Sequence, residues 1–227
     1  MASRPALQRF DLHTHSAHSP DSGVRVEDMV RQARANGLSG MAITDHNQVE
    51  GSLKSRSFAE PGFIAVRATE VSTSAGHIIA LGVGELIPRD LSPAEAVERI
   101  HALGGIASIA HPLRIWSGVG EAEARRIPAD LIETLNARTI PKHNALASAI
   151  AKERGFGVTA GSDAHELRNI GRAYVVIEDR IETEEQLIEA LRKGRARAEG
   201  NSRKPAEWIP YGVKCIVQWM FRGFKRM

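Results

Sequence analysis

The stretch RFDLHTH, residues 9–15, reads as a buried β-strand that ends in two histidines. Side chains alternate between the two faces of a strand, so His13 and His15 share one face, about 7 Å apart along the backbone. That spacing allows both imidazoles to bind one metal ion. Because the chain has nine histidines, a His-x-His pair alone is weak evidence, and the surrounding sequence must supply the context.

The pattern of a short apolar run followed by a polar side chain recurs along the chain. Between residues 8 and 163 such runs alternate with helical patterns, which predicts parallel strands joined by helical crossovers. A chain of 227 residues, 42% of them hydrophobic, is long enough to bury the core of one such domain. We therefore expect an α/β fold, a small (β/α) barrel, with seven candidate strands at residues 9–15, 40–46, 63–70, 77–82, 106–111, 131–136 and 157–163.

The ends of several helices can be located from capping residues. The run SPAE, residues 92–95, is a capping box with proline at the first helical position. Thr183 with Gln186 follows the same capping logic. Further helices are expected over residues 26–36 and 141–154, each followed by a glycine.

Nearly every other candidate strand ends in a side chain that can bind a metal ion. These side chains are Asp45 and His46, Glu70, His111, Asp163 and His165, and His77 opens a strand. A barrel gathers the carboxyl ends of its strands around one mouth, so side chains distant in sequence can meet there. Any one of them could equally be a buried or surface polar residue, but their recurrence favours a metal site. The chain has one cysteine, Cys215, so nitrogen and oxygen ligands are expected.

At these positions the sequence resembles the PHP family, the polymerase and histidinol phosphatase group of metal-dependent phosphoesterases. The resemblance runs from residue 10 to about 175, through the motifs DLHTHSAHSPDSG, ITDHN, ATEVST, GHIIALG, IAHPLR and GSDAHELRNIG, in family order. It implies a distorted (β/α)7 barrel, which we place at residues 8–198, and a hydrolase of phosphoric esters that uses two or three divalent cations.

The resemblance also implies which side chains hold the ions. The first ion would be bound by His13, His15, Glu70 and Asp163. Glu70 would bridge to a second ion, bound also by His77 and His111. The third would take Asp21, His46 and His165. Imidazole and carboxylate suit Zn²⁺, Mn²⁺ or Fe²⁺. Because some members have histidine where this chain has Asp21, Mg²⁺ is also compatible with the third and weakest site.

The expected reaction is hydrolysis of a phosphomonoester or phosphodiester by metal-bound hydroxide, because clustered cations neutralise anionic oxygens and acidify water. Arg114 and Arg168 are candidate catalytic residues that would clamp the phosphate. Arg114 resembles an arginine that contacts phosphate in related phosphatases. Asp11 and Asp45 are expected to orient imidazoles. His18 either contacts substrate or is solvated in its loop.

The substrate remains open between a phosphorylated small molecule and a short nucleic acid. One alternative is a 5′–3′ exonuclease or nucleotide phosphodiesterase, and another, from a different class, is a non-catalytic metal-stabilised interaction module. Only 51 residues separate His111 from Asp163, which leaves no room for a lid domain. The site is therefore expected to be open, or covered by Trp116 and the loop 114–128.

Residues 199–227 are expected to form a connector and a basic amphipathic helix. Residues 191–227 carry ten Lys/Arg and two Asp/Glu, which leaves 20 against 25 for the rest of the chain. The helix would pack on the barrel or on a second copy, bind a membrane surface peripherally, or contact nucleic acid. No run approaches the roughly 20 apolar residues of a membrane span, so a cytoplasmic protein is expected. The apolar face of this helix would comprise Val213, Ile216, Val217, Met220, Phe224 and Met227.

Overall fold

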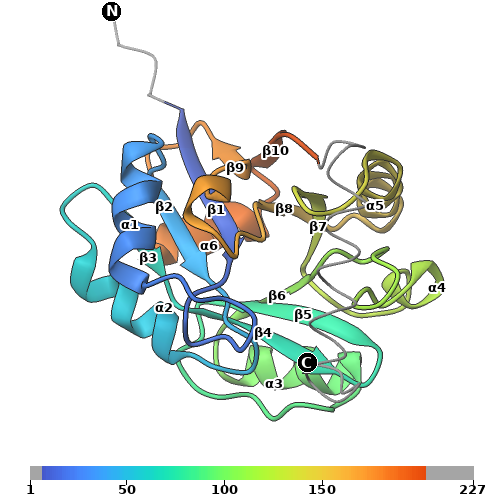
Figure 1. Ribbon diagram of the computed structural model, residues 1–227. Helices are drawn as coiled ribbons and strands as arrows, with labels where there is room; N and C mark the ends of the chain where they lie inside the picture. Colours follow the sequence, from blue (N-terminus) through green and yellow to red (C-terminus); the bar gives the residue numbers. More distant parts are fainter. Residues whose placement is uncertain (1–6, 203–227) are drawn as a thin grey trace, which may run out of the picture.

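The computed structural model describes residues 7–202, in which ten strands form two five-stranded sheets (Figure 1). The first sheet has the order β10 (Ala196–Gly200), β9 (Ala173–Ile177), β1 (Gln8–Thr14), β2 (Gly40–Ile43) and β3 (Ile64–Val66). The second has the order β4 (Ala68–Thr73), β5 (Gly76–Leu81), β6 (Ile106–Ile109), β7 (Leu131–Asn136) and β8 (Gly157–Gly161). The α/β class is therefore confirmed.

The expectation of one closed barrel of seven parallel strands is wrong for the described residues, because hydrogen bonding divides the strands between two sheets. The break lies at Arg67, where the predicted strand 63–70 passes from one sheet to the other as β3 and β4. There the backbone N–H of Arg67 donates to the Glu184 carboxylate at 2.6 Å instead of to a neighbouring strand. A side chain remote in sequence thus satisfies the backbone group that the break exposes.

Pairing also departs from the all-parallel expectation. Only two residues connect β4 to β5, and such a short connection permits only an antiparallel hairpin, in which Thr73 pairs with Gly76. Gly76 has φ of 126°, a backbone region open to glycine. β5 also pairs antiparallel with β6, and β9 with both β1 and β10.

The two sheets are joined by backbone hydrogen bonds at the carboxyl ends of their strands. At one seam, Asp163 N–H donates to the His13 carbonyl at 2.7 Å, and His15 N–H donates to the Ala164 carbonyl at 2.9 Å. At the other seam, Glu70 N–H donates to the Asp45 carbonyl at 3.2 Å. Four of these six residues are predicted metal ligands and the other two, Ala164 and Asp45, are immediate neighbours of predicted ligands, so the sheets meet where the site was expected.

Helices cover the outer faces of the sheets (Figure 1). The predicted capping signals are confirmed: the Ser92 side chain accepts from Glu95 N–H while Glu95 accepts from Ser92 N–H, and Gly155 takes the left-handed conformation after its helix. Thr183 likewise accepts from Gln186 N–H. The helices are α1 (Val26–Ala35), α2 (Glu50–Ser55), α3 (Pro93–Ala102), α4 (Glu121–Ala124), α5 (Pro141–Arg154) and α6 (Glu184–Arg192), with short 3₁₀ turns at Arg56–Phe58 and Leu167–Asn169.

The core fills the space between the sheets and beneath the helices. Phe10, Leu12 and Ile79 are among the buried residues between the sheets, and α1 packs Met29 over Met41. β10 extends to Gly200, so the first sheet runs two residues past the predicted boundary at 198. The predicted basic helix lies outside the described residues. No helix within residues 7–202 has the length and apolar character needed to cross a bilayer.

Candidate metal centre

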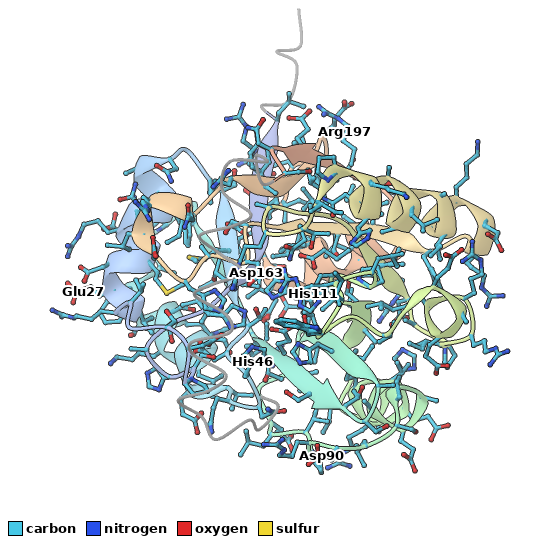
Figure 2. The ribbon with its side chains drawn as sticks, turned by 45° about the vertical axis from the view of Figure 1, so that its right-hand side comes forward. Glu27, His46, Asp90, His111, Asp163 and Arg197 are labelled. Carbon is cyan, nitrogen blue, oxygen red and sulfur yellow. The ribbon has the colours of Figure 1, made fainter. Side chains whose placement is uncertain are left out.

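The structure brings all nine predicted ligands together. Figure 2 shows His46, His111 and Asp163 in the interior, whereas Glu27 and Asp90 lie at the periphery. Within this cluster, sets of three side chains place ligand atoms within 4.8 Å of one another, and these sets draw on His13, His15, Asp21, His46, Glu70, His77, His111, Asp163 and His165. Their sources are β1, β4, β5 and the segments that follow β1, β2, β6 and β8.

Glu70 lies at the centre of the cluster, and its two oxygens face different imidazoles. Oε1 lies 2.8 Å from His77 Nδ1 and 2.9 Å from His111 Nε2. Oε2 lies 3.2 Å from both His13 Nε2 and His15 Nε2. A carboxylate that presents one oxygen to each of two nitrogen groups has the arrangement expected of a bridging ligand.

The side of the cluster formed by β1 also includes Asp163. Its Oδ1 lies 3.5 Å from His15 Nε2 and 3.9 Å from His13 Nε2. His13 Nε2 and His15 Nε2 are themselves 3.2 Å apart. Together with Glu70 Oε2, four candidate ligand atoms thus converge from positions 13, 15, 70 and 163 of the chain.

A third group surrounds Asp21, whose Oδ2 lies 2.6 Å from His165 Nε2 and 3.8 Å from His46 Nε2. Burial would raise the pKa of Asp21. The hydrogen bond from His165 and the positive charge of the His165 ring in its protonated form outweigh the effect of burial and hold the pKa of Asp21 below the usual range. This carboxylate is therefore ionised at neutral pH and available as an oxygen ligand.

Burial keeps several imidazoles neutral. It lowers the pKa of His46 to about 3 and, with the nearby Arg138 guanidinium, the pKa of His165 to about 4. Burial and Arg114 also hold the pKa of His111 well below its usual value. A metal ligand must offer an unprotonated nitrogen, so these three side chains are in the form that binds cations.

The carboxylates give the centre of the cluster a negative field. Burial alone would lower the pKa of His13, but Glu133 and Glu70 outweigh it and raise that pKa well above its usual value. Burial would raise the pKa of Glu70, yet His46 and His13 hold it well below its usual range. A buried site that stabilises positive charge in this way is suited to a divalent cation.

An unpaired ring nitrogen is a further observation that supports divalent-cation binding by this set of side chains. Nδ1 of His46 is buried without a hydrogen-bond partner among the described residues, and it lies 3.4 Å from Glu70 Oε2. Unpaired buried nitrogens are costly in a finished core, so they mark a site that a bound ion completes. Nitrogen and oxygen donors without sulfur are compatible with Zn²⁺, Mn²⁺ or Fe²⁺.

Glu133 on β7 is a site residue that sequence reasoning missed. Its Oε1 lies 3.0 Å from His13 Nδ1, and its Oε2 accepts from His111 N–H at 2.7 Å and from Asn136 Nδ2 at 3.1 Å. The signal was present in LIETLN, where a glutamate interrupts a strand that is otherwise mostly apolar. A buried carboxylate in such a strand needs specific partners, and here they are two histidines of the cluster.

Asp11 and Asp45 do not orient imidazoles, contrary to expectation. Asp11 accepts from Ser162 N–H at 2.9 Å and Gly171 N–H at 2.8 Å, and burial raises its pKa to about 6 despite these bonds. Asp45 accepts from the N–H and hydroxyl of Ser16, both at 2.6 Å. Both carboxylates fix the loops that carry ligands, because a carboxylate beside backbone N–H groups bonds those first.

Of the two arginines predicted to clamp phosphate, one lies at the cluster and the other does not. Arg114 Nη2 lies 2.5 Å from Asp163 Oδ2, at the cluster. Arg168 is not brought there: its side chain is 81% exposed and pairs with Glu166. Arg138, which the sequence did not single out, lies 2.9 Å from Asp163 Oδ1. Trp116 is 67% exposed, so it does not cover the site as a packed lid would.

Backbone strain is concentrated at the cluster. His111 and Asp163 have φ of 26° and 51°, a region that side-chain-bearing residues seldom occupy. Such conformations persist where surrounding bonds impose them, as the Glu133 carboxylate does for His111 N–H and the His13 carbonyl for Asp163 N–H. These conformations direct His111 toward Glu70 and Asp163 toward His15.

Comparison with known proteins agrees with this arrangement. The family model described as PHP domain matches residues 11–85, and the model described as PHP-associated matches residues 141–196. An uncharacterised protein of Methanocaldococcus jannaschii is 34% identical over 143 residues, 57% of this chain and 82% of the relative. Fold and cluster thus define an α/β protein with a histidine–carboxylate centre between two sheets.

The chain belongs to the PHP family. Among solved structures, a two-domain protein of Bacteroides vulgatus containing a predicted PHP-like metal-dependent phosphoesterase is similar, with a TM-score of 0.71 and 18% identity. The alignment covers 86% of this chain and 65% of that one. Endonuclease Q in complex with a 27-mer duplex is similar with a TM-score of 0.65 and 15% identity, over 86% of this chain and 60% of that one. At these identities the likeness shows the fold alone.

Proposed function

We propose that this protein is a hydrolase that cleaves a phosphoester at a cluster of divalent cations. The observation that carries the proposal is that the two oxygens of the Glu70 carboxylate contact different pairs of histidines. Oε1 lies near His77 and His111, and Oε2 lies near His13 and His15. Two cations held on one carboxylate are the usual arrangement for activating water and stabilising both the attacking and leaving oxygens of a phosphoryl centre.

The ligands divide into three groups in this proposal. The first cation would be held by His13, His15, Glu70 and Asp163, the second by Glu70, His77 and His111, and the third by Asp21, His46 and His165. Zn²⁺, Mn²⁺ or Fe²⁺ suits the first two groups, and Mg²⁺ is also compatible with the third, where a carboxylate replaces an imidazole. When bound, the cations supply charge neutralisation and a hydroxide at neutral pH.

The chain's own residues position the phosphate. Arg114 and Arg138 both contact Asp163, with side chains 19% and 18% exposed, so each guanidinium reaches from the surface toward the cluster. A guanidinium carries N–H donors in a planar fork that matches phosphoryl oxygens. Asn136 receives a hydrogen bond from Arg114 at 2.7 Å, which fixes the orientation of that guanidinium. Together they orient the ester against the cations.

A second candidate is phosphodiester hydrolysis in nucleic acid. The fold similarity to endonuclease Q bound to a DNA duplex favours it. The two candidates differ in the substrate that reaches the cluster, not in the cluster itself. A 5′-phosphorylated oligonucleotide compared with a mononucleotide distinguishes them, because only the second candidate predicts shortened oligonucleotides.

The test is metal-dependent turnover of a generic phosphoester such as 4-nitrophenyl phosphate. We expect Mn²⁺ to support nitrophenol release by the full chain, and Glu70→Gln to abolish it. His143→Ala is the matched control: it removes a histidine from α5, outside the cluster, and should retain wild-type rates. Full activity of Glu70→Gln would refute the proposal. Bound metal that stabilises the fold without turnover of any phosphoester would favour a non-catalytic module instead.

A further inference from the structure

An open groove adjoins the metal centre and is lined by residues 17–20, 46–48 and 86–89. We call it the mouth groove. Its volume is about 720 Å³, and His46 belongs both to its lining and to the cluster. A phosphate held at the His46 side of the cluster therefore has this groove beside it. Pockets of a few hundred to about 1,000 Å³ hold whole organic ligands, so the groove has room for much more than a phosphate.

The walls of the mouth groove are fixed before any ligand arrives. Asn47 donates from Nδ2 to Ser72 Oγ at 3.0 Å and accepts at Oδ1 from Ser72 N–H at 2.9 Å, which ties the floor to β4. Elsewhere in the lining, Ile87 is only 4% exposed and anchors its loop in the core. Asp90 N–H donates to the Ser72 carbonyl at 2.8 Å and closes the same loop onto β4. A preformed groove loses little ordering entropy on binding.

Several side chains in the lining of the groove are apolar. Leu86 is 54% exposed, although leucine gains from burial, and it lies in the lining with Pro88 and Pro20. A flat ring laid against these side chains would remove their apolar surface from water. The groove therefore favours an organic group with an apolar face.

The polar lining indicates the charge of that group. None of the residues lining the groove is acidic, and its one cationic side chain, Arg89, pairs with Asp90 Oδ2 at 2.9 Å beside the lining. The His18 imidazole and the Gln48 amide make no hydrogen bond to other described residues, so both can donate to and accept from a ligand. A cationic amine would find no carboxylate in this lining, whereas a neutral or anionic ring with hydrogen-bonding edges would find partners.

We propose that the mouth groove binds the organic group of the phosphoester, and that this group is a neutral or anionic ring system with an apolar face and hydrogen-bonding edges. This inference rests on the proposed phosphoester hydrolysis at the adjoining cluster and assigns its substrate class. The phosphate lies at the cluster, and the ring lies between Leu86 and the segment 17–20.

The experiment compares adenosine 5′-monophosphate with ribose 5-phosphate, which share the ribose phosphate ester and differ in the adenine ring that the groove would bind. Phosphate release gives kcat/KM for each with Mn²⁺ and the full chain. Leu86→Glu removes an apolar side chain from the lining and adds a negative charge. The preference for adenosine 5′-monophosphate over ribose 5-phosphate should therefore fall about tenfold, which is the effect of losing one hydrophobic contact in a pocket. Leu7→Glu is the control, because Leu7 is 50% exposed just before β1, at the end of that strand opposite the ligands.

The outcomes separate this inference from the proposed function. Turnover by the wild type with an unchanged preference in Leu86→Glu overturns the groove assignment and leaves the hydrolase intact. If the wild type releases phosphate from neither ester, the hydrolase proposal fails. Equilibrium dialysis in the presence of Mn²⁺ then measures the binding of each ester and tests whether the groove binds the ring. The assignment is supported if the wild type binds the nucleotide more tightly than ribose 5-phosphate and Leu86→Glu abolishes this difference. Equal binding of both esters by the wild type overturns it. A change in sedimentation without a change in preference would make the groove an interface between copies and also overturn it.

Discussion

Glu133→Gln is the most informative single substitution, because it keeps the shape of the side chain and changes one atom beside His13. Glu133 contacts His13 Nδ1 at 3.0 Å, His111 N–H at 2.7 Å and Asn136 Nδ2 at 3.1 Å. Both N–H donors lie at Oε2, so the glutamine oxygen will remain there. Its NH₂ group then faces His13 Nδ1.

The consequence is a change of tautomer. A carboxylate beside Nδ1 holds a proton on that nitrogen and leaves Nε2 free to bind a cation. An NH₂ donor at the same place requires an unprotonated Nδ1, and the proton moves to Nε2. That atom faces Glu70 Oε2 at 3.2 Å, the position where a ligand nitrogen is needed.

Loss of such an orienting partner costs about 10- to 100-fold in metal affinity or activity, or about 1.4–2.7 kcal/mol. Calorimetric titration with Mn²⁺ and kcat/KM for 4-nitrophenyl phosphate measure both quantities. Glu98→Gln makes the same chemical change on the exposed face of α3 and should match the wild type. Wild-type Mn²⁺ affinity in Glu133→Gln would refute the role assigned to this carboxylate.

Three further predictions concern stability. Chelation of metal should lower the Tm, and excess Mn²⁺ should restore it, because a free-ion concentration of 100 times Kd adds about 2.7 kcal/mol to the free energy of unfolding. An unchanged Tm would show that the folded chain holds no ion. Glu184→Ala should cost about 1–3 kcal/mol in urea unfolding, because it leaves the Arg67 N–H, where the sheets divide, without its acceptor; a loss below 0.5 kcal/mol would contradict this account. Gly161→Ala should cost about 1–3 kcal/mol and weaken Mn²⁺ binding, because the added Cβ overlaps the His13 backbone and Cβ; wild-type values for both would show that β1 can shift freely.

Local signals in the sequence predicted the helices well. The capping box at Ser92 and the glycine at position 155 act within a few residues, so the helix ends they predict are present in the structure. Of the nine candidate ligands, eight were identified because they follow or open an apolar run, and Asp21 was identified only from its position in a family motif. Bringing them together requires only that strand ends share one mouth, which two joined sheets achieve as well as a barrel.

The division into two sheets could not be read from the sequence, because it depends on partners far along the chain. Arg67 leaves its sheet where Glu184, 117 residues later, accepts its N–H. Nothing local distinguishes a strand that continues from one that is interrupted there. Glu133 was missed for a related reason: it binds His13 and the His111 backbone, and motifs identify ligands more readily than the groups that hold them.

The measurement that tests the central claim most directly is an anomalous-scattering map of crystals grown with Mn²⁺. Bridging by Glu70 predicts two ions about 3.5–4 Å apart, the spacing of two-metal sites, with Oε1 on the ion near His77 and His111 and Oε2 on the ion near His13 and His15. A single ion, or ions that do not contact Glu70, would contradict it.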